Sequence, residues 1–355
     1  MSLVAWCQAA VEAQLPQVCE KGTLRIHALS SCPRPVCSLY PLAHVHPTDA
    51  RADEAVPTWQ EHVIVTAAYR GQDAWRLAYA LELYVYTLPR ERAGLVYVSK
   101  LDSSGYGPPT PSPADRAHLP PARSLTSTLT AAALHYFLVH DHWTTPIDHI
   151  SLHVLARAQD AYLFPSSHKH PNKRVLSDAA LIRWWQTCLS HVALSVQARA
   201  FYVIPGYSRL DSHAIVPLHH ANDSAVSRAQ WQYGHPYHLA DVPLPLHPCA
   251  WEHRHAATRS EALAARVVPT MIPVFPDDPK GRFVKEQAAT AHEPGASMKP
   301  IPRAASPAHR EAMAERQALE RLSVDGFWER MGFRQECCSG NAVGIFVVST
   351  TRQGG

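Results

Sequence analysis

The feature that most constrains the fold of this chain is a pair of apolar segments, at residues 81–88 (LELYVYTL) and 95–99 (LVYVS). Both are rich in aromatic and β-branched residues, which favour strands that pack against neighbouring strands. The short polar segment 89–94 (PRERAG) separates them and has the composition of a turn. Because both segments must be buried, we predict an antiparallel hairpin in the protein core.

Further segments extend this hairpin into a sheet. Residues 62–69 (HVIVTAAY) and 23–29 have strand composition, and with the hairpin they predict a largely antiparallel sheet in the N-terminal half. Near the other end, residues 342–350 (AVGIFVVST) are typical of a buried strand, with a possible strand before it at 333–338. The end of the sequence is therefore expected to return to the sheet.

Helical periodicity marks three segments. Residues 122–140 place apolar side chains near helical spacing after a proline-rich run, which suits a helix start. In residues 179–193 apolar side chains, Trp185 among them, recur at three- and four-residue steps, and Ser177 is positioned to cap this helix. A third helical pattern covers 310–322.

The length of 355 residues allows one large domain or two ordinary ones, because single cores stop growing at roughly 250–300 residues. A hydrophobic share of 46% against 18% charged residues is typical of a globular chain. The predicted core segments are spread from the first hundred residues to the last twenty. We therefore predict a single α/β domain over residues 1–355, with a mixed central β-sheet surrounded by helices and with inserted loops near 205–265 and 289–310.

Composition excludes several classes of protein. A net charge of +3 without any block of like charges does not predict a nucleic-acid-binding surface. The absence of a signal-peptide core and of an apolar run of eighteen residues predicts a soluble, intracellular chain that does not enter membranes and whose eight cysteines stay reduced. Cys32 with Cys37, or Cys249 with His253 and His255, lack paired zinc-site spacing, so no metal is expected.

The first segment that carries chemistry is 98–106 (VSKLDSSGY), where the second predicted strand ends in Asp102, two serines and a glycine. Exposed backbone N–H groups at such a strand end can contact a ligand. The alternative interpretation is an ordinary turn at the exit of the hairpin.

The second segment begins at Arg157 and ends at the tryptophan pair of the predicted helix. Tyr162 and Trp185 can line an apolar slot, while Lys173 and Arg174 can bind phosphate groups. The alternative is that the aromatic residues belong to the core and the basic residues to a solvated surface.

The third segment is 273–283 (PVFPDDPKGRF), which places Asp277, Asp278, Lys280 and Arg282 between two proline-stiffened apolar anchors. A simple turn explains the Asp-Asp-Pro sequence. A turn does not require a lysine and an arginine in the same rigid loop, so this pattern favours a functional site.

Together with FWERMGFRQE at 327–336, these segments resemble the fungal histone acetyltransferases named for regulation of Ty transposition, which are related to the metazoan CBP acetyltransferase domain. The blocks LVYVSKLDSSGY, ARAQDAYLFPSS, LSDAALIRWW and PVFPDDPKGRF carry the resemblance, and their order along the chain also matches. The resemblance implies an enzyme that transfers the acetyl group of acetyl-coenzyme A directly to a lysine.

The resemblance also implies roles for individual residues. Asp278, with Asp277 beside it, corresponds to the acidic group next to the acceptor lysine, and Trp185 and Tyr162 correspond to walls of the lysine channel. Lys280 corresponds to a lysine that family members acetylate on themselves. The positions that match cofactor-binding residues are Leu101, Asp102, Ser103, Arg157, Lys173, Arg174 and Arg282.

The partners implied by the resemblance are newly synthesised histone H3 with histone H4, an anti-silencing-type chaperone and a nucleosome-assembly-type chaperone, in the nucleus. Chromatin assembly and the DNA damage response are the implied processes. In this sequence only about a dozen residues separate Phe137 from Ile150, where the family has a long segment that helps engage the chaperone. A catalytically silent scaffold of the same fold that binds histones or chaperones is therefore the alternative, and the 23 histidines raise a weaker one, a protein that binds metal or nucleic acid.

Overall fold

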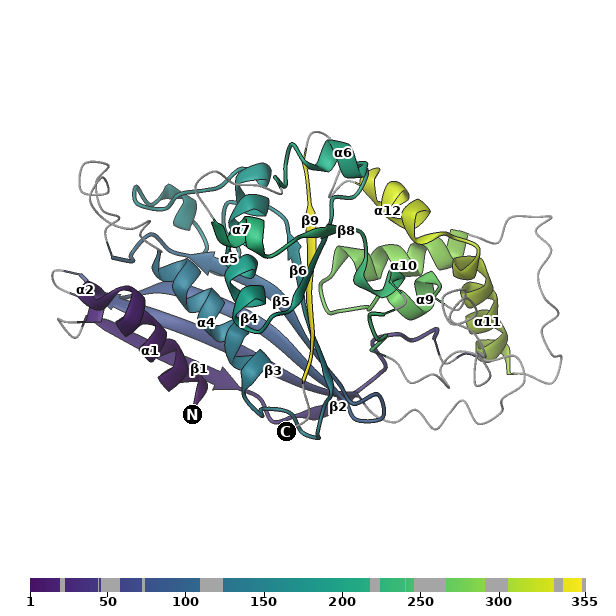
Figure 1. Cartoon of the computed structure of the whole chain (residues 1–355), viewed down its shortest axis with the longest axis horizontal. Coiled ribbons are helices and arrows are strands. Elements are labelled where there is room, and N and C mark those ends of the chain that lie inside the picture. The colour runs from purple at the N-terminus through teal and green to yellow at the C-terminus, as the bar shows by residue number, and fades with distance from the viewer. Residues whose placement is uncertain are drawn as a thin grey trace.

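A computed structural model of the chain describes residues 1–19, 23–43, 45, 58–71, 74–108, 124–217, 224–239, 241–245, 266–290, 306–334 and 341–352. Its centre is a nine-stranded sheet with the strand order β1-β3-β4-β5-β6-β9-β7-β8, and β2 pairs with β3 at one side (Figure 1). The strands are β1 (Leu24–Ser30), β2 (Arg34–Val36), β3 (Thr58–Arg70), β4 (Trp75–Leu88), β5 (Ala93–Ser103), β6 (His149–Ala156), β7 (Arg199–Val203), β8 (Gln232–Tyr233) and β9 (Gly344–Thr351).

The sheet is mixed, as predicted from the sequence. Strands β1, β3, β4 and β5 pair antiparallel in succession, whereas β5 and β6 are parallel, as are β7 and β8. Strand β9 pairs antiparallel with both β6 and β7, so residues from the end of the sequence lie inside the sheet. The predicted hairpin is confirmed as β4 and β5, and both strands are longer than their apolar segments.

Helices cover both faces of the sheet. Figure 1 shows α1 (Leu3–Gln14), α4 (Leu125–Val139), α5 (Asp178–Ser195) and α7 (Ser224–Arg228) across the face that points toward the viewer. The helices α9 (Val268–Met271), α10 (Pro279–Thr290), α11 (Pro307–Glu320) and α12 (Val324–Gly332) gather on the right, beyond β9. The remaining short elements are α2 (Pro16–Cys19), η1 (Ser167–Lys169), α6 (Arg209–Ser212) and η2 (Pro236–His238). In the described part of the chain, no helix is long and apolar enough to span a bilayer.

Strand alternation divides the apolar side chains between the two faces. In β9, Phe346 belongs to the core under α1, α4 and α5, whereas Ile345 belongs to the core under α9 to α12. In β5, Val96 points into the first of these cores, and Tyr97 points to the opposite face, where it meets Phe275. Because successive side chains of a strand point to opposite faces, β5 contributes to the packing of both layers.

The structure confirms the helices predicted at 122–140, 179–193 and 310–322 as α4, α5 and α11. Ser177 occupies the N-cap position of α5, but its side chain makes no capping hydrogen bond, so this detail of the prediction was wrong.

Two further predictions need correction. The possible strand at 333–338 was wrong for its described part, because α12 ends at Gly332 and the chain continues in a turn, while 335–338 lie outside the described residues. The expected loops between 205 and 265 contain α6, α7 and β8, which the weak periodicity did not reveal, and residues 218–223, 240 and 246–265 of this stretch lie outside the described residues.

Candidate active site

The carboxylate of Asp102, at the end of β5, collects hydrogen bonds from the second predicted segment. Its Oδ2 atom accepts three successive backbone N–H groups, from Tyr162 and Leu163 at 2.9 Å and from Phe164 at 3.0 Å. Its Oδ1 atom accepts the backbone N–H of Ser103 at 2.8 Å and the ammonium of Lys173 at 2.7 Å. One side chain therefore joins two segments that lie about sixty residues apart in the sequence.

Lys173 is buried with its partner. The exposed fractions of the Lys173 and Asp102 side chains are 5% and 6%, and the ammonium also donates to the hydroxyl of Ser167 at 2.6 Å. Burial alone would raise the pKa of Asp102, but the hydrogen bonds from Lys173 and from the three backbone N–H groups outweigh it and hold that pKa below its ordinary value. The lowered pKa keeps Asp102 ionised at neutral pH, so its carboxylate can bind the Lys173 ammonium.

Tyr162 closes the loop that follows β6. Its hydroxyl donates to the carbonyl oxygen of Arg157 at 2.6 Å, and its ring is half-buried. Burial raises the pKa of this phenol to about 12, although the nearby Arg157 guanidinium opposes the shift. Tyr162 therefore remains a neutral hydrogen-bond donor at physiological pH.

The third predicted segment holds a second buried ion pair. Asp278 Oδ1 accepts the backbone N–H of Lys280 at 2.9 Å, and Oδ2 accepts its ammonium at 2.5 Å. The same ammonium donates to the carbonyl oxygen of Pro273 at 2.7 Å and lies 4.9 Å from the ring centre of Phe275. The Asp278 side chain is 0% exposed and that of Lys280 is 6% exposed. The carboxylate thus binds an alkylammonium group in a setting closed to water.

Asp277 points away from this pair. Its backbone adopts a left-handed conformation with φ of 53°, which turns two consecutive carboxylates in different directions. The side chain of Asp277 is 78% exposed, and its carboxylate lies 3.7 Å from the ammonium of Lys100 on β5. Lys100 is held in turn by Glu82 at 2.9 Å.

An aromatic stack joins β5 to the third segment. The ring of Phe275 lies parallel to that of Tyr97, with 4.4 Å between the ring centres and 5° between the ring planes. Tyr97 precedes Asp102 on β5 by five residues, while Phe275 precedes Asp278 by three. Strand β5 therefore positions both loops of the candidate site. The sequence prediction had treated Phe275 only as an apolar anchor and did not include Tyr97.

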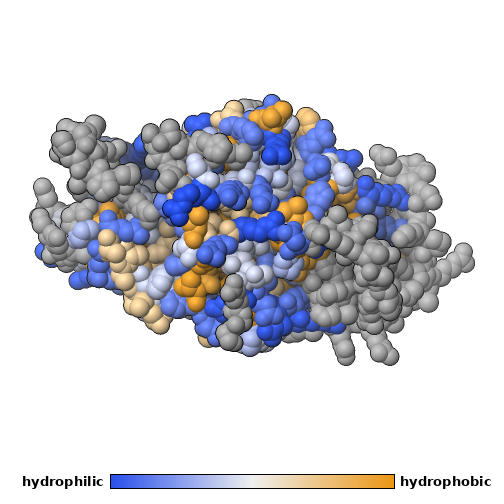
Figure 2. Space-filling model, in the orientation of Figure 1, coloured by the Kyte–Doolittle hydropathy of each residue, from blue (hydrophilic) through white to orange (hydrophobic). Residues whose placement is uncertain are grey.

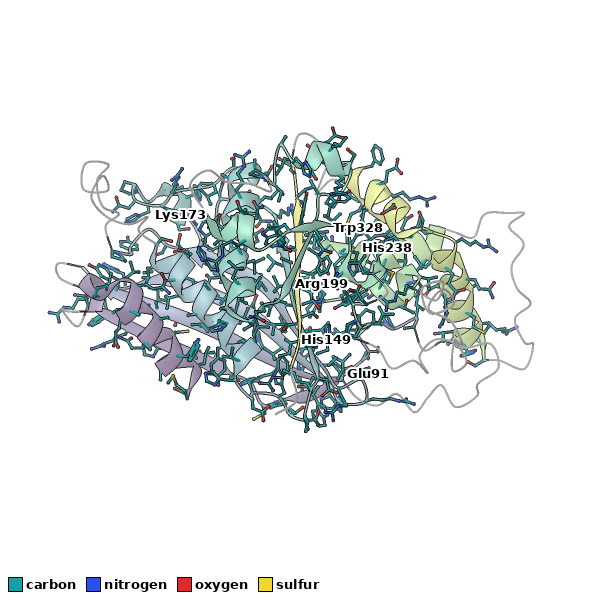
Figure 3. The ribbon with its side chains drawn as sticks, in the orientation of Figure 1. Glu91, His149, Lys173, Arg199, His238 and Trp328 are labelled. Carbon is teal, nitrogen blue, oxygen red and sulfur yellow. The ribbon has the colours of Figure 1, made fainter. Side chains whose placement is uncertain are left out.

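A buried polar group behind the third segment was also missed. The hydroxyl of Tyr237 donates to Ser151 at 3.0 Å, and Ser151 lies 3.0 Å from Nε2 of His153. His235 lies next to Tyr237 and stacks on Trp328 of α12, which Figure 3 labels. Burial and the nearby Lys280 ammonium lower the pKa of His235 to about 3. The alternation of polar residues along β6 was the signal that sequence reasoning could have used.

Trp185 lies deeper than its predicted role suggests. It is 4% exposed, it belongs to the core between α5 and the sheet, and its ring meets that of Trp184 edge to face at 5.0 Å. None of the aromatic pairs formed by the described residues joins Trp185 to Tyr162. The structure therefore gives Trp185 a packing role, and its role as a wall of a lysine channel stays a prediction.

Three arginines at predicted cofactor positions form no ion pair with any described residue. Arg157 is half-buried, Arg174 and Arg282 are exposed, and no described carboxylate pairs with any of their guanidinium groups. A cleft of about 360 Å³ is lined by the residues that follow Arg157 and Arg174 in the chain, but not by either arginine; its lining residues are Ala158, Gln159, Asp160, Val175, Leu176, Ser177, Asp178 and Asn341. Guanidinium groups without a carboxylate partner suit an anionic ligand such as a phosphate-bearing cofactor, whereas this cleft is lined by two carboxylates, Asp160 and Asp178. Leu101 and Ser103, which flank Asp102, are half-buried.

A second cleft of about 290 Å³ lies away from all of these residues. It is apolar and lies between α1, α4 and α5, where Figure 2 shows apolar atoms at the left of the visible face. Its lining residues are Trp6, Ala9, Ala10, Gln14, Ala131, Ala132, His135, His191, Val192 and Ser195. No residue of the three predicted segments lines this cleft.

The candidate site therefore combines two buried carboxylate–ammonium pairs, Asp102–Lys173 and Asp278–Lys280, on a mixed α/β fold. Comparison with known families is more specific, because the model of the histone acetyltransferase KAT11-type domain matches residues 125–354. This match covers more than half of the chain, so the chain belongs to the KAT11-type histone acetyltransferase family.

Individual relatives agree with this assignment. The chain is 26% identical over 348 residues to histone acetyltransferase rtt109 of Aspergillus flavus, covering 90% of this chain and 52% of the relative. It is 26% identical over 274 residues to histone acetyltransferase rtt109 of Schizosaccharomyces pombe, covering 76% of this chain and 56% of the relative. The chain therefore spans about half the length of these curated relatives.

A solved structure supports the fold. The crystal structure of Rtt109 from Aspergillus fumigatus superposes with a TM-score of 0.62 at 22% sequence identity, covering 98% of this chain and 79% of that chain. The predicted mixed α/β fold is thereby confirmed, and so is the family resemblance.

Proposed function

We propose that this protein is a histone lysine N-acetyltransferase that moves the acetyl group of acetyl-coenzyme A directly to lysines of newly synthesised histone H3. In this proposal histone H4 accompanies H3, the two types of histone chaperone assist, and the protein acts in the nucleus in chromatin assembly and the DNA damage response. The observation that carries the proposal is the enclosed Asp278–Lys280 pair within a KAT11-type domain.

The chemistry requires a carboxylate that can bind an alkylammonium group. An acceptor lysine has an unperturbed pKa of about 10.4 and must lose its proton before its amine attacks an acyl carbon. Asp278 already binds such a group, the ammonium of Lys280, in a buried setting. We infer that an acceptor lysine takes the place of the Lys280 ammonium, and that Asp278 orients it or accepts its proton. Asp277, which is exposed beside Lys100, contacts the approaching substrate at the entrance.

Lys280 would then control access to Asp278. As placed, its ammonium occupies the carboxylate that the acceptor lysine needs. Acetylation of Lys280 by the protein itself would remove that charge and break the ion pair. A neutral amide cannot compete for Asp278 as an ammonium does, so the modified protein would bind an acceptor lysine more readily.

Acetyl-coenzyme A supplies a thioester and an anionic phosphate-bearing arm. Arg157, Arg174 and Arg282 fit this arm because their guanidinium groups are unpaired in the described part of the chain. By resemblance, Leu101 and Ser103 at the end of β5 contact the remainder of the cofactor, although the backbone N–H of Ser103 is already bonded to Asp102. Lys173 belongs to the same set by resemblance, and its ammonium would contact the cofactor only from its place beside Asp102 and Ser167.

The alternative function is a catalytically silent scaffold that binds histones or chaperones. The two functions separate at Asp278, because a carboxylate that is 0% exposed and already paired reaches a substrate only if the Lys280 ammonium is displaced. The two functions differ in whether the protein catalyses acetyl transfer.

The test is acetyl transfer from labelled acetyl-coenzyme A to an H3–H4 complex, with and without each type of chaperone, followed by mass-spectrometric mapping of sites. We expect chaperone-stimulated transfer that falls by at least about 100-fold in Asp278→Asn, the range for a positioned acid–base group. Asp148→Asn is the matched control, since Asp148 is 61% exposed and pairs with Arg92 away from the site. Cofactor binding without transfer under any condition would instead establish the scaffold.

A further inference from the structure

We propose that Asp102 and Lys173 are positioning residues, which fix the Tyr162 loop against the end of β5 without contacting substrate or cofactor themselves. This inference rests on the proposed acetyltransferase function. It differs from the roles that the resemblance implies, in which both residues face the cofactor.

The first observation is that the hydrogen-bonding capacity of Asp102 is used within the protein. A carboxylate offers about four lone-pair sites, and Asp102 accepts five donors: four backbone N–H groups and one ammonium. Three of the donors are the consecutive N–H groups of residues 162–164, all on Oδ2. No lone pair remains for a ligand, whereas every bond that is made constrains the loop.

The second observation is that the Lys173 side of the ion pair is also buried. The ammonium of Lys173 donates to Asp102 and to Ser167, and its side chain is 5% exposed. Figure 3 places Lys173 on the opposite side of β9 from Trp328, far from the α9 to α12 layer. Because its ammonium is bonded to Asp102 and Ser167, Lys173 is not positioned to bind a solvent-exposed phosphate group.

The third observation is that the turn after Asp102 packs on the turn that contains Lys173. Gly105 has a left-handed φ of 91°, and a Cβ atom there would lie 2.4 Å from Nδ1 of His170 and 3.1 Å from the backbone nitrogen of Lys173. The ring centre of Tyr106, the next residue, lies 4.2 Å from that of His170. The two segments are thus in contact along both the ion pair and the backbone, and glycine permits this approach.

The consequence concerns Tyr162. Its backbone N–H is held by Asp102, and its hydroxyl is held by the Arg157 carbonyl, so both ends of the residue are fixed. Arg157 is proposed above to bind the cofactor, and the resemblance assigns Tyr162 to the wall of the lysine channel. Asp102 and Lys173 therefore act on the reaction through them, by setting the position of the loop.

The test uses a double variant, Asp102→Ala with Lys173→Met, which removes the ion pair without leaving a buried charge. The matched control is Asp148→Ala with Arg92→Met. This double variant removes the Arg92–Asp148 ion pair, whose side chains are 54% and 61% exposed. Amide hydrogen exchange at residues 162–164, the acetyl-coenzyme A Kd, and the kcat and KM of acetyl transfer are measured in both variants and in the wild-type protein.

We expect exchange at residues 162–164 to be at least about tenfold faster in the Asp102/Lys173 variant, because the loop amides lose their acceptor. We expect kcat to fall by about 10- to 100-fold through misplacement of the loop, while the acetyl-coenzyme A Kd changes less than about threefold. The control pair should match the wild-type protein in all three measurements.

Unchanged exchange at residues 162–164, or a large rise in the acetyl-coenzyme A Kd with unchanged kcat, would overturn the positioning role. If the double variant does not fold, Asp102→Ala and Lys173→Met are compared singly by the same exchange measurement, and protected loop amides in Asp102→Ala also overturn it. The exchange readout does not depend on activity. Absence of transfer in the wild-type protein would therefore contradict the proposed function and still leave the loop contact tested.

Discussion

Replacement of Lys280 by methionine tests how strongly the enclosed ion pair holds the candidate active-site loop. The variant removes the ammonium that lies 2.5 Å from Asp278 and 2.7 Å from the Pro273 carbonyl oxygen. It leaves Asp278, whose side chain is 0% exposed, without a counter-charge. Breaking a buried ion pair by removing one partner costs about 3–5 kcal/mol, because the remaining charge stays desolvated. Lys280→Met should therefore lower the free energy of unfolding by about that amount.

This expected loss is a large fraction of the total free energy of unfolding of an ordinary protein, about 5–15 kcal/mol. The double variant with Asp278→Asn should recover more than half of the loss, since it removes the unpaired charge and keeps a hydrogen-bonding side chain of the same shape. Lys285→Met is the control, because Lys285 is exposed on the same helix, α10, and surface substitutions change stability by about 0.5 kcal/mol or less.

The assay is urea unfolding at neutral pH, followed by circular dichroism, with the midpoint and slope compared among the four proteins. A loss below about 1 kcal/mol in Lys280→Met would refute the reasoning, since that value is typical of an exposed pair. Equal losses in Lys280→Met and in the double variant would also refute it, because the unpaired buried charge would then not be the cause.

Two further predictions concern Trp185 and His235. Trp185→Ala should lower the free energy of unfolding by about 3–5 kcal/mol because it opens a cavity in the core of α5, while Trp185→Phe should lose less, as measured by the same urea unfolding. If Trp185→Phe retains stability but loses acetyl transfer, the ring also contacts substrate; normal transfer would leave it a packing residue. The buried ring of His235 has its pKa lowered to about 3, so below pH 6.5 the unfolded state binds a proton that the folded state does not. The free energy of unfolding should therefore decrease as the pH is lowered from 6.5 to about 3, by about 1.4 kcal/mol per pH unit for this group. His235→Phe should reduce that slope in unfolding curves measured across the range, and an unchanged slope would contradict the assignment.

Local patterns in the sequence were sufficient for several elements. The strands β4, β5 and β9 have continuous or alternating apolar residues, and α5 repeats its apolar residues at helical spacing. These patterns reflect which side of each element faces a core, and that information is local. Strands β6 and β7 were not predicted, since histidine and serine interrupt the apolar residues of the first and the second has five residues. The buried polar side chains of Ser151 and His153 in β6 are accommodated because Tyr237, more than eighty residues away in the sequence, lies within hydrogen-bonding distance of both.

Strand order was not available from local pattern. Strand β9 lies between β6 and β7, although its residues follow both by more than 140 positions. Pairing of this kind depends on which apolar faces match after the helices have covered the sheet. It is a property of the assembled core and not of any one segment.

The candidate site divides in the same way. By itself, the sequence determined that residues 273–283 are rich in charge, that Asp102 lies at a strand end, and that both belong to one family pattern. The prediction of a loop over this whole segment was wrong, because α10 begins at Pro279 and carries Lys280 and Arg282. Only the tertiary structure decided that Asp278 is enclosed while Asp277 is exposed, since a single left-handed residue turns one of two identical side chains outward. Only the tertiary structure brought Asp102 to three N–H groups sixty residues away, because a buried carboxylate must collect donors from wherever the fold places them.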